Sequence, residues 1–253
     1  MIWSRIDGPF HRCVGNQGAS ALNENRKITS GFCYLPHMGR APSLCGVILA
    51  AGESTRMGTD KALLPWPPPA PGAVVTGQTF LSAAIKALNL YNDLVIVVAG
   101  KNLENLAPIV YAHSAFLVCN PAPERGQFSS LQVGLQEVLN RGRDAAMVTL
   151  VDRPPVSPAT LARLHRAFED AVSAEKWALV PEYGGKHSHP FLVAREMIEL
   201  FLKAPASATA RDIEHQNQAR IEYFPVDDPL IALNVDTPED YAALASASAP
   251  PWK

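Results

Sequence analysis

The chain has 253 residues, of which 47% are hydrophobic and 18% charged, and its formal net charge is -2 at pH 7. This length suits one large domain, and the near-neutral charge gives no electrostatic basis for binding nucleic acid. No apolar run approaches the roughly 18 residues that span a membrane, and the first residues lack the apolar segment of a secretory signal. We therefore expect a cytoplasmic protein that binds neither nucleic acid nor membrane.

The first segment, residues 1–43, has no helical or strand periodicity and is interrupted by glycines and prolines. We expect an irregular, mobile leader, followed by a single domain over residues 44–248. Met38 lies seven residues before the first predicted strand, so translation could also start there. The sequence leaves both interpretations open.

The stretch Gly46–Lys61, GVILAAGESTRMGTDK, joins an apolar strand to a glycine-containing loop that carries two cations. Gly52 and Gly58 permit positive φ, so successive N–H groups can converge on an anion. Arg56 and Lys61 add positive charge. The loop therefore predicts a polyphosphate ligand.

Two common phosphate loops do not fit this stretch. A Walker A loop has Lys-Ser/Thr directly after its second glycine, whereas Thr59 and Asp60 separate Gly58 from Lys61 here. The dinucleotide fingerprint needs a Gly-x-Gly pair at the strand end, which residues 49–52, LAAG, do not supply. An ATPase of the Walker type and an NAD-binding protein are both disfavoured.

The stretch resembles the first motif of the MobA-like nucleotidyltransferases, Leu-Ala-Ala/Gly-Gly-x-x-x-Arg-Met-Gly-x-x-Lys, a family that contains the molybdenum cofactor guanylyl- and cytidylyltransferases. The resemblance implies that the loop backbone wraps a nucleoside triphosphate whose phosphates the two cations neutralise. The nucleotide-binding residues implied in this way are Leu49, Ala50, Ala51, Gly52, Arg56 and Lys61. In the family, alanine at the position of Ala51 accompanies cytidylyl transfer and glycine accompanies guanylyl transfer. We therefore expect CTP rather than GTP.

Residues 65–72, PWPPPAPG, cannot donate most backbone hydrogen bonds, so they form neither a helix nor a central strand. We expect an extended surface loop. It is either a plain insertion or a lid over the nucleotide, and a polyproline ligand for a partner domain is a third interpretation.

The predicted strands are continuous apolar runs for the most part, which indicates burial on both faces. They cover residues 45–50, 94–99, 115–119, 145–151, 177–181, 220–225 and 231–235. Apolar residues at helical spacing separate them, as at 131–139 and 161–172. The pattern predicts an α/β fold, a doubly wound three-layer αβα sandwich with a mostly parallel sheet, and the resemblance implies the nucleotide-diphospho-sugar transferase type.

The segment that follows the third strand, from Asn120 through residues 124–131, ERGQFSSL, resembles the family segment that borders the nucleotide and the second substrate. The resemblance implies that Asn120 and Ser130 contact the nucleotide and that Gly126 lies at the acceptor pocket. One serine of the pair Ser129 and Ser130 is expected to cap the following helix, which leaves the other for a phosphate or base edge.

Asp152 directly follows the strand 145–151. Ligands in open α/β sheets bind at the carboxyl ends of strands, so this carboxylate faces the same crevice as the loop. One or two carboxylates plus substrate phosphates are typical of Mg²⁺ sites, although a helix-capping role is equally compatible with the spacing. The resemblance favours the metal, because the family carries its metal-binding aspartate in an Asp-x-Pro context. Arg153 stands where relatives often have glutamine, which leaves the local substrate contacts open.

The turn 184–190, GGKHSHP, resembles the Gly-His-Pro turn of the family, which implies that His189 shapes the acceptor pocket. The two histidines of this turn lack a third ligand at zinc-site spacing, so zinc is disfavoured.

Residues 231–240, IALNVDTPED, resemble the closing motif of the family, in which a strand leads into Asp/Asn-x-Asp/Asn-Thr-Pro-Glu-Asp. Asp236 is then either a second metal ligand or part of a helix cap, and Asn234 is a weaker candidate for a substrate contact. Glu239 and Asp240 are better explained by the dipole of the helix that follows.

Together these motifs predict Mg²⁺-dependent nucleotidyl transfer, in which Arg56, Lys61 and Asp152 are the catalytic residues. A terminal phosphate of the acceptor attacks the α-phosphorus of the triphosphate and pyrophosphate leaves. The resemblance implies a molybdopterin-type acceptor, and a molybdoenzyme or cofactor-delivery protein as partner. Two alternatives stay open: a sugar-phosphate or alcohol-phosphate nucleotidyltransferase, and a non-catalytic nucleotide-binding or cofactor-binding chaperone.

Overall fold

The computed structural model describes residues 42–69 and 77–246, and all of these belong to one compact unit, Gly39–Lys253. The predicted leader lies outside the described residues except for its last two positions, and Met38 lies outside them as well. None of the described helices combines the length and hydropathy needed to cross a membrane.

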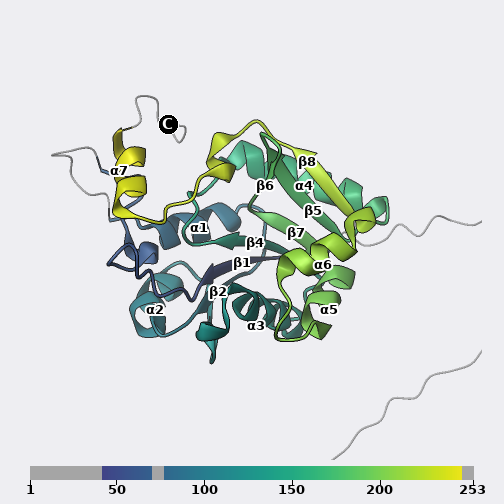
Figure 1. The fold of residues 1–253 in the computed structure, drawn as a ribbon, viewed down its shortest axis with the longest axis horizontal. Helices are drawn as coiled ribbons and strands as arrows, with labels where there is room; N and C mark the ends of the chain where they lie inside the picture. Colours follow the sequence, from purple (N-terminus) through teal and green to yellow (C-terminus); the bar gives the residue numbers. More distant parts are fainter. Residues whose placement is uncertain (1–41, 70–76, 247–253) are drawn as a thin grey trace, which may run out of the picture. The chain divides into compact units, whose positions relative to one another are not determined.

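The described strands form one mixed sheet in the order β3-β2-β1-β4-β7-β5-β6, with β8 paired to β5 (Figure 1). Their bounds are β1 Leu44–Ala50, β2 Val95–Ala99, β3 Phe116–Cys119, β4 Ala145–Leu150, β5 Ala178–Tyr183, β6 Lys186–His187, β7 Phe191–Ala194 and β8 Ile221–Pro225. The β1–β4 half is parallel, as is the β5–β8 pair, whereas β7 runs antiparallel to both β4 and β5 and β6 runs antiparallel to β5. The predicted α/β class with a mostly parallel sheet is confirmed.

The helices cover both faces of the sheet, as predicted for a three-layer sandwich. They are α1 Phe80–Leu88, α2 Leu103–Ala112, α3 Gln127–Asn140, α4 Pro158–Ser173, α5 Arg195–Lys203, α6 Ala210–Gln216 and α7 Pro238–Ser246. Helices α1, α2 and α4 contribute to one hydrophobic cluster and α3, α5 and α6 to the other, and Figure 1 shows α5 and α6 side by side near β7. Along β1, Ile48 and Ala50 face the first cluster while Val47 and Leu49 face the second. Burial on both faces explains the continuous apolar runs.

Gly134 lets α3 lie close to the sheet. A Cβ at this position would be 2.8 Å from Cγ1 of Val47 and 3.0 Å from Cγ2 of Val98. A side chain here would push the two valine side chains away, so the absence of a Cβ lets α3 pack directly on β1 and β2. The first turn of α3 lies near the ends of β1 and β4, since Gln127 and Ser130 line the same cavity as Leu49 and Leu150.

The described sheet differs from the prediction in three places. The predicted strand over 231–235 is wrong, because Asp228 accepts a hydrogen bond from the Leu230 N–H at 3.0 Å and Pro229 starts the short 3₁₀ helix η4, Pro229–Ala232. Ile231 is buried by packing rather than by strand pairing. Strands β6 and β7 were not predicted. Strand β6 has only two residues and lies within the predicted turn 184–190, and the four apolar residues of β7 directly follow this turn.

The proline-rich segment is anchored by Trp66, which is only 5% exposed. Its ring packs edge-on against Phe80 with centroids 4.9 Å apart, in a satellite cluster formed by Met57, Trp66, Phe80, Ala83 and Val235. The expectation of an extended surface loop is therefore wrong at Trp66. Residues 70–76, which include the end of this segment, lie outside the described residues.

Candidate active site

The candidate site lies where β1 and β4 end. These neighbouring strands are parallel, with Leu49 opposite Leu150, so the loop after β1 and Asp152 after β4 leave the sheet at the same edge. The N–H of Val235 donates to the carbonyl oxygen of Asp152 at 2.9 Å, which brings the closing segment of the chain to this edge as well. Three segments that are distant in sequence therefore meet here.

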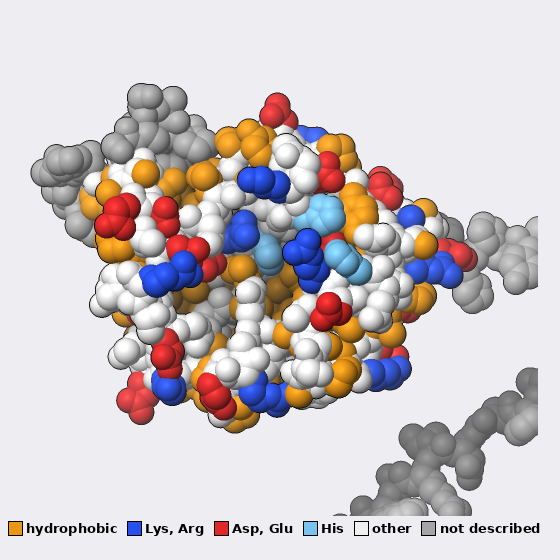
Figure 2. Space-filling model, viewed as in Figure 1, with side chains coloured by type: hydrophobic (Ala, Val, Ile, Leu, Met, Phe, Trp, Pro, Cys, Tyr) orange, Lys and Arg blue, Asp and Glu red, His pale blue; other side chains and the backbone are white. Residues whose placement is uncertain are grey.

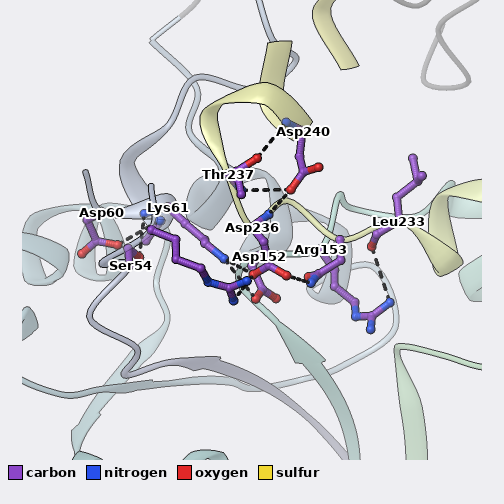
Figure 3. A network of polar contacts seen from close by, with 12 residues as sticks. Ser54, Asp60, Lys61, Asp152, Arg153, Leu233, Asp236, Thr237 and Asp240 are labelled. Atoms are coloured by element: carbon purple, nitrogen blue, oxygen red, sulfur yellow. Dashed lines mark hydrogen bonds and ion pairs between the residues drawn. The ribbon is translucent and has the colours of Figure 1, made fainter. Parts of the chain in front are cut away.

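An ion cluster occupies the meeting point (Figure 3). Lys61 Nζ lies 2.7 Å from Asp236 Oδ1 and 3.5 Å from Asp152 Oδ2, and Arg56 Nη2 lies 2.9 Å from Asp236 Oδ1. The Lys61 side chain is 10% exposed, whereas that of Arg56 is 69% exposed. All four of the charged residues predicted for the site are thus brought together.

The loop before Lys61 is shaped by two residues with positive φ. Gly58 has the predicted positive φ, at 72°. The second residue with positive φ is Ser54, at 52°, and not Gly52 as predicted. Ser54 also accepts hydrogen bonds from the N–H groups of Met57 and Lys61, through its carbonyl and its hydroxyl oxygen. Ser54 was missed by the sequence analysis because the family motif leaves its position unspecified.

Asp236 reaches the ion cluster from the loop between η4 and α7, and not from a strand end as predicted. Asp240 Oδ2 accepts hydrogen bonds from the N–H groups of Asp236 and Thr237, both at 2.9 Å, and these bonds lower the pKa of Asp240. Thr237 Oγ1 in turn accepts a hydrogen bond from the N–H of Asp240 at 3.3 Å, so Thr237 and Asp240 cap the start of α7 reciprocally. The carboxylate of Asp236 is left to bind Lys61 and Arg56, and it also accepts a hydrogen bond from Asn234.

A cavity of about 320 Å³ opens beside the ion cluster. Of the residues predicted to bind nucleotide, metal or acceptor, those in its wall are Leu49, Ala51, Gly52, Arg56, Lys61, Gly126, Ser130, Asp152 and Asp236. The wall also contains Ser54, Thr55 and Gln127, which the sequence analysis did not single out.

Ala50 and Asn120, both predicted to bind nucleotide, lie behind the wall of this cavity. Asn120 is 3% exposed and donates hydrogen bonds to the hydroxyl groups of Ser129 and Ser130, both at 2.9 Å. The predicted capping serine is wrong: α3 starts after Gly126, whose φ is 93°, without a side-chain cap. Asn120 instead holds the two serines in the first turn of α3.

A second cavity of about 910 Å³ adjoins the first, since Leu49, Gly126 and Gln127 line both. Its apolar wall comes from β5, β7, α3 and α5, and includes Val180, Phe191, Val193, Met197 and Phe201. Its wall carries three cations, Arg125, Lys186 and Arg211, and one carboxylate, Glu214. The other polar lining residues are His187, His189, His215, Gln127, Ser188, Ser207 and Thr209. Figure 2 shows histidine, lysine and arginine side chains gathered around a hollow on this face. The predicted acceptor residues Gly126 and His189 both line this cavity.

His189 lies in the wall of the larger cavity, against the ring of Phe191. Burial, and then the charge of Arg153, lower its pKa to about 3, so the imidazole is neutral at physiological pH. Its Nδ1 is buried and has no hydrogen-bond partner within the described residues. Arg153 itself is half-buried, and its Nη1 donates to the carbonyl oxygen of Ile231 at 3.1 Å and to Ser188 Oγ at 3.4 Å.

The carboxylates of the ion cluster fit a divalent cation such as Mg²⁺. Asp152 Oδ1 is buried and has no hydrogen-bond partner among residues 42–69 and 77–246. In the same part of the chain there is no cluster of three or more metal-ligating His, Cys, Asp and Glu side chains. The protein would therefore supply two carboxylates, Asp152 and Asp236, and the substrate phosphates would supply further oxygens, which is the usual arrangement for Mg²⁺.

Comparison with protein families matches residues 46–221 to the MobA-like NTP transferase domain. A probable molybdenum cofactor guanylyltransferase of Rhodopirellula baltica is 33% identical over 137 residues, which are 54% of this chain and 61% of that protein, less than two thirds of its length. A probable molybdenum cofactor guanylyltransferase of Mycobacterium avium is 30% identical over 217 residues, covering 84% of this chain and 100% of that protein. The molybdenum cofactor cytidylyltransferase of Escherichia coli is 23% identical over 200 residues, covering 77% and 92%.

The fold is also similar to solved structures. The Rv0371c protein of Mycobacterium tuberculosis H37Rv superimposes with a TM-score of 0.64 at 25% identity, covering 81% of this chain and 99% of that protein.

Proposed function

The chain belongs to the MobA-like NTP transferase family, and we propose that it transfers a nucleoside monophosphate from a triphosphate to a molybdopterin-type acceptor. The observation that carries the proposal is the position of Lys61 between Asp152 and Asp236, at the end of a loop suited to phosphates. Pyrophosphate is the second product.

The triphosphate binds in the smaller cavity. Lys61 and Arg56 now pair with Asp236, and phosphate oxygens that enter the cavity offer both cations stronger partners. The Lys61 side chain is only 10% exposed, so its ammonium group is largely shielded from water. This shielding strengthens its interaction with the negative charge that develops on the phosphates. Arg56 and Lys61 thus stabilise the departing pyrophosphate.

Mg²⁺ is the proposed cofactor, with Asp152 and Asp236 as its protein ligands. When bound, it would neutralise phosphate charge and help to orient the triphosphate. The support from the protein is the buried, unpartnered Oδ1 of Asp152, next to a second carboxylate held by Lys61.

The acceptor binds in the larger cavity, whose basic rim attracts a phosphorylated molecule while the apolar wall accommodates a ring system. Because Gly126 and Gln127 line both cavities, the terminal phosphate of the acceptor can approach the α-phosphorus of the nucleotide. A phosphate oxygen of the acceptor forms the new bond to this phosphorus, and the bond to the bridging oxygen of pyrophosphate breaks. The attacking oxygen is already anionic, so the protein positions the two substrates and balances their charge.

CTP is the proposed donor. The support for it is Ala51, which lines the smaller cavity at the position where the family has glycine for guanylyl transfer. Two of the three relatives described above are named guanylyltransferases and one a cytidylyltransferase. The base is therefore the part of the proposal that a direct comparison of CTP with GTP must test.

The test is a pyrophosphate-release assay with ATP, CTP, GTP and UTP in Mg²⁺, with and without molybdopterin cofactor, and with a sugar 1-phosphate as competing acceptor. We expect release only when CTP and the molybdopterin acceptor are both present. Faster release from GTP would overturn the choice of base. Release that depends on the sugar phosphate would support the sugar-phosphate alternative, and thermal stabilisation by a nucleotide without any release would support the non-catalytic alternative.

A further inference from the structure

The turn that follows β2 lies against the start of the triphosphate loop, which we define as residues 50–61. Gly100 in this turn is so close to the loop that a Cβ there would lie 2.7 Å from the carbonyl oxygen of Ala51. Real Cβ atoms do not approach a backbone oxygen this closely. The turn and the loop are therefore in direct backbone contact.

Asn102, two residues further on, ties the two ends of the triphosphate loop together. Its Nδ2 donates to the carbonyl oxygen of Ala50 at 3.0 Å and to Asp60 Oδ2 at 2.7 Å. Its Oδ1 accepts from the N–H of Gly100 at 3.1 Å, which anchors the amide to the β2 turn. Both amide N–H groups and the carbonyl oxygen are thus engaged, which fixes the orientation of the side chain.

The contact with Asp60 extends to Lys61. Asp60 Oδ1 accepts a hydrogen bond from the N–H of Ala62 at 3.0 Å and so caps the 3₁₀ turn η1, Lys61–Leu63. This turn carries the lysine whose ammonium group binds Asp236 at 2.7 Å. Asn102 is therefore connected to the ion cluster through the side chain of Asp60 and the backbone of the turn η1.

We infer that Asn102 is a positioning residue for the nucleoside triphosphate. Asn102 lines neither cavity. It acts by holding Ala50 and Asp60 at a fixed distance from each other, so that the loop amides and Lys61 are placed to contact the phosphates. The inference rests on the proposed function, because it concerns the donor side of nucleotidyl transfer. Small misplacements of groups that position a substrate can cost up to about a hundredfold in rate.

The test compares Asn102→Ala and Asn102→Asp with Asn105→Ala and Asn105→Asp. Asn105 is exposed in the first turn of α2, so the control variants make the same chemical changes away from the loop. We expect Asn102→Asp to raise the KM for the triphosphate by about tenfold or more while the KM for the acceptor stays within about twofold. The introduced carboxylate faces Ala50 O and Asp60, so its effect should exceed that of Asn102→Ala.

A double variant tests the contact itself. When Asp60→Asn is combined with Asn102→Asp, the amide and the carboxylate exchange places and one hydrogen bond between them is restored. We expect this double variant to recover part of the triphosphate KM lost in Asn102→Asp. A KM that is no better than that of the single variant would count against the inference.

Hydrogen exchange separates this inference from the proposed function. Backbone amides of residues 50–62 should exchange faster in Asn102→Ala than in the wild-type protein, and should be unchanged in Asn105→Ala. Equal exchange in Asn102→Ala and wild type, or an unaltered triphosphate KM, would overturn the positioning role. A wild-type protein that releases no pyrophosphate from any triphosphate would overturn the proposed function instead, while the exchange experiment would still decide whether Asn102 holds the loop.

Discussion

Lys61 and Asp236 are 175 residues apart in the sequence, yet Lys61 Nζ and Asp236 Oδ1 lie 2.7 Å from each other. The lysine comes from the loop after β1 and the aspartate from the segment before α7, and the contact joins the two ends of the domain at the site. With Asp152 at 3.5 Å, Lys61 is the central charge of the cluster.

We expect Lys61→Ala to lower kcat at least about a hundredfold, which corresponds to about 3 kcal/mol of transition-state stabilisation. The variant lacks the charge that offsets the departing pyrophosphate. Lys86→Ala, which removes an exposed lysine of α1, is the matched control. Steady-state kinetics measure the effect, and circular dichroism melts check the fold. Near-normal turnover in a folded Lys61→Ala protein would disprove the role.

Asp152→Asn should lower turnover at least about a hundredfold and raise the Mg²⁺ concentration needed for half-maximal activity. The amide keeps the shape of the side chain but removes the negative charge that the metal requires. Asp93→Asn serves as control, because Asp93 is 70% exposed and pairs with Arg143 across 3.7 Å. Mg²⁺ titration of the pyrophosphate-release rate is the measurement, and an unchanged metal requirement would argue against Asp152 as a ligand.

Ala51→Gly should shift the ratio of kcat/KM for CTP over GTP toward GTP by about tenfold, since one methyl group in a pocket contributes selectivity of about this size. Ala50→Gly is the control. It deletes the same methyl group one residue earlier, where the side chain packs into the core instead of lining the cavity. An equal shift in both variants would show that the methyl group of Ala51 does not select the base.

His189 should make stability depend on pH in the acidic range. An unfolded histidine takes up a proton near pH 6.5, whereas burial and the charge of Arg153 hold the native pKa at about 3. Between these values the unfolded state binds the extra proton, so the free energy of unfolding falls as the pH is lowered from about 6.5 toward 3.

His189→Gln removes this titration and should flatten the dependence. Urea unfolding at pH 4, 5, 6 and 7 compares the variant with wild type, and His215→Gln, at an exposed position of α6, controls for the loss of a histidine. The same slope in wild type and His189→Gln would mean that the imidazole of His189 does not carry the effect.

Trp66→Ala should lower the free energy of unfolding by about 3–5 kcal/mol, because it removes a 5% exposed ring from the satellite cluster. Trp66→Phe should cost less, since a smaller ring can keep part of the contact with Phe80 at 4.9 Å. Urea denaturation measures both. A loss well under 1 kcal/mol in Trp66→Ala would show that the proline-rich segment is only loosely attached.

Local patterns predicted much of this structure. The apolar run before Gly52 and the strand before Asp152 are continuous in sequence, and their burial on both faces of the sheet follows from that. The wrong strand over 231–235 has the same origin. Ile231 and Val235 of this segment are buried, whereas Leu233 is 36% exposed. Asp228 and Pro229 start a 3₁₀ helix here, and the run of hydrophobic residues obscured this competing local signal.

The partners of polar side chains could not be predicted in this way. Asn120 matched a nucleotide-binding position, but its amide is used by Ser129 and Ser130 inside the protein. Asn102 belongs to no motif in the sequence, yet it joins both ends of the triphosphate loop. Hydrogen-bond partners depend on distances across the fold, and these distances are not encoded in the spacing of any one segment.

Sequence patterns alone located β1 to β5 and β8 and gave the chemistry of the loop that ends at Lys61, because periodicity and side-chain type act over a few neighbouring residues. The folded structure was needed to show that β7 runs antiparallel between β4 and β5, and that Asp236 binds Lys61 while Thr237 and Asp240 cap α7. Backbone pairing and ion pairs form among all the groups that the packed core brings together, and the core forms from the whole chain.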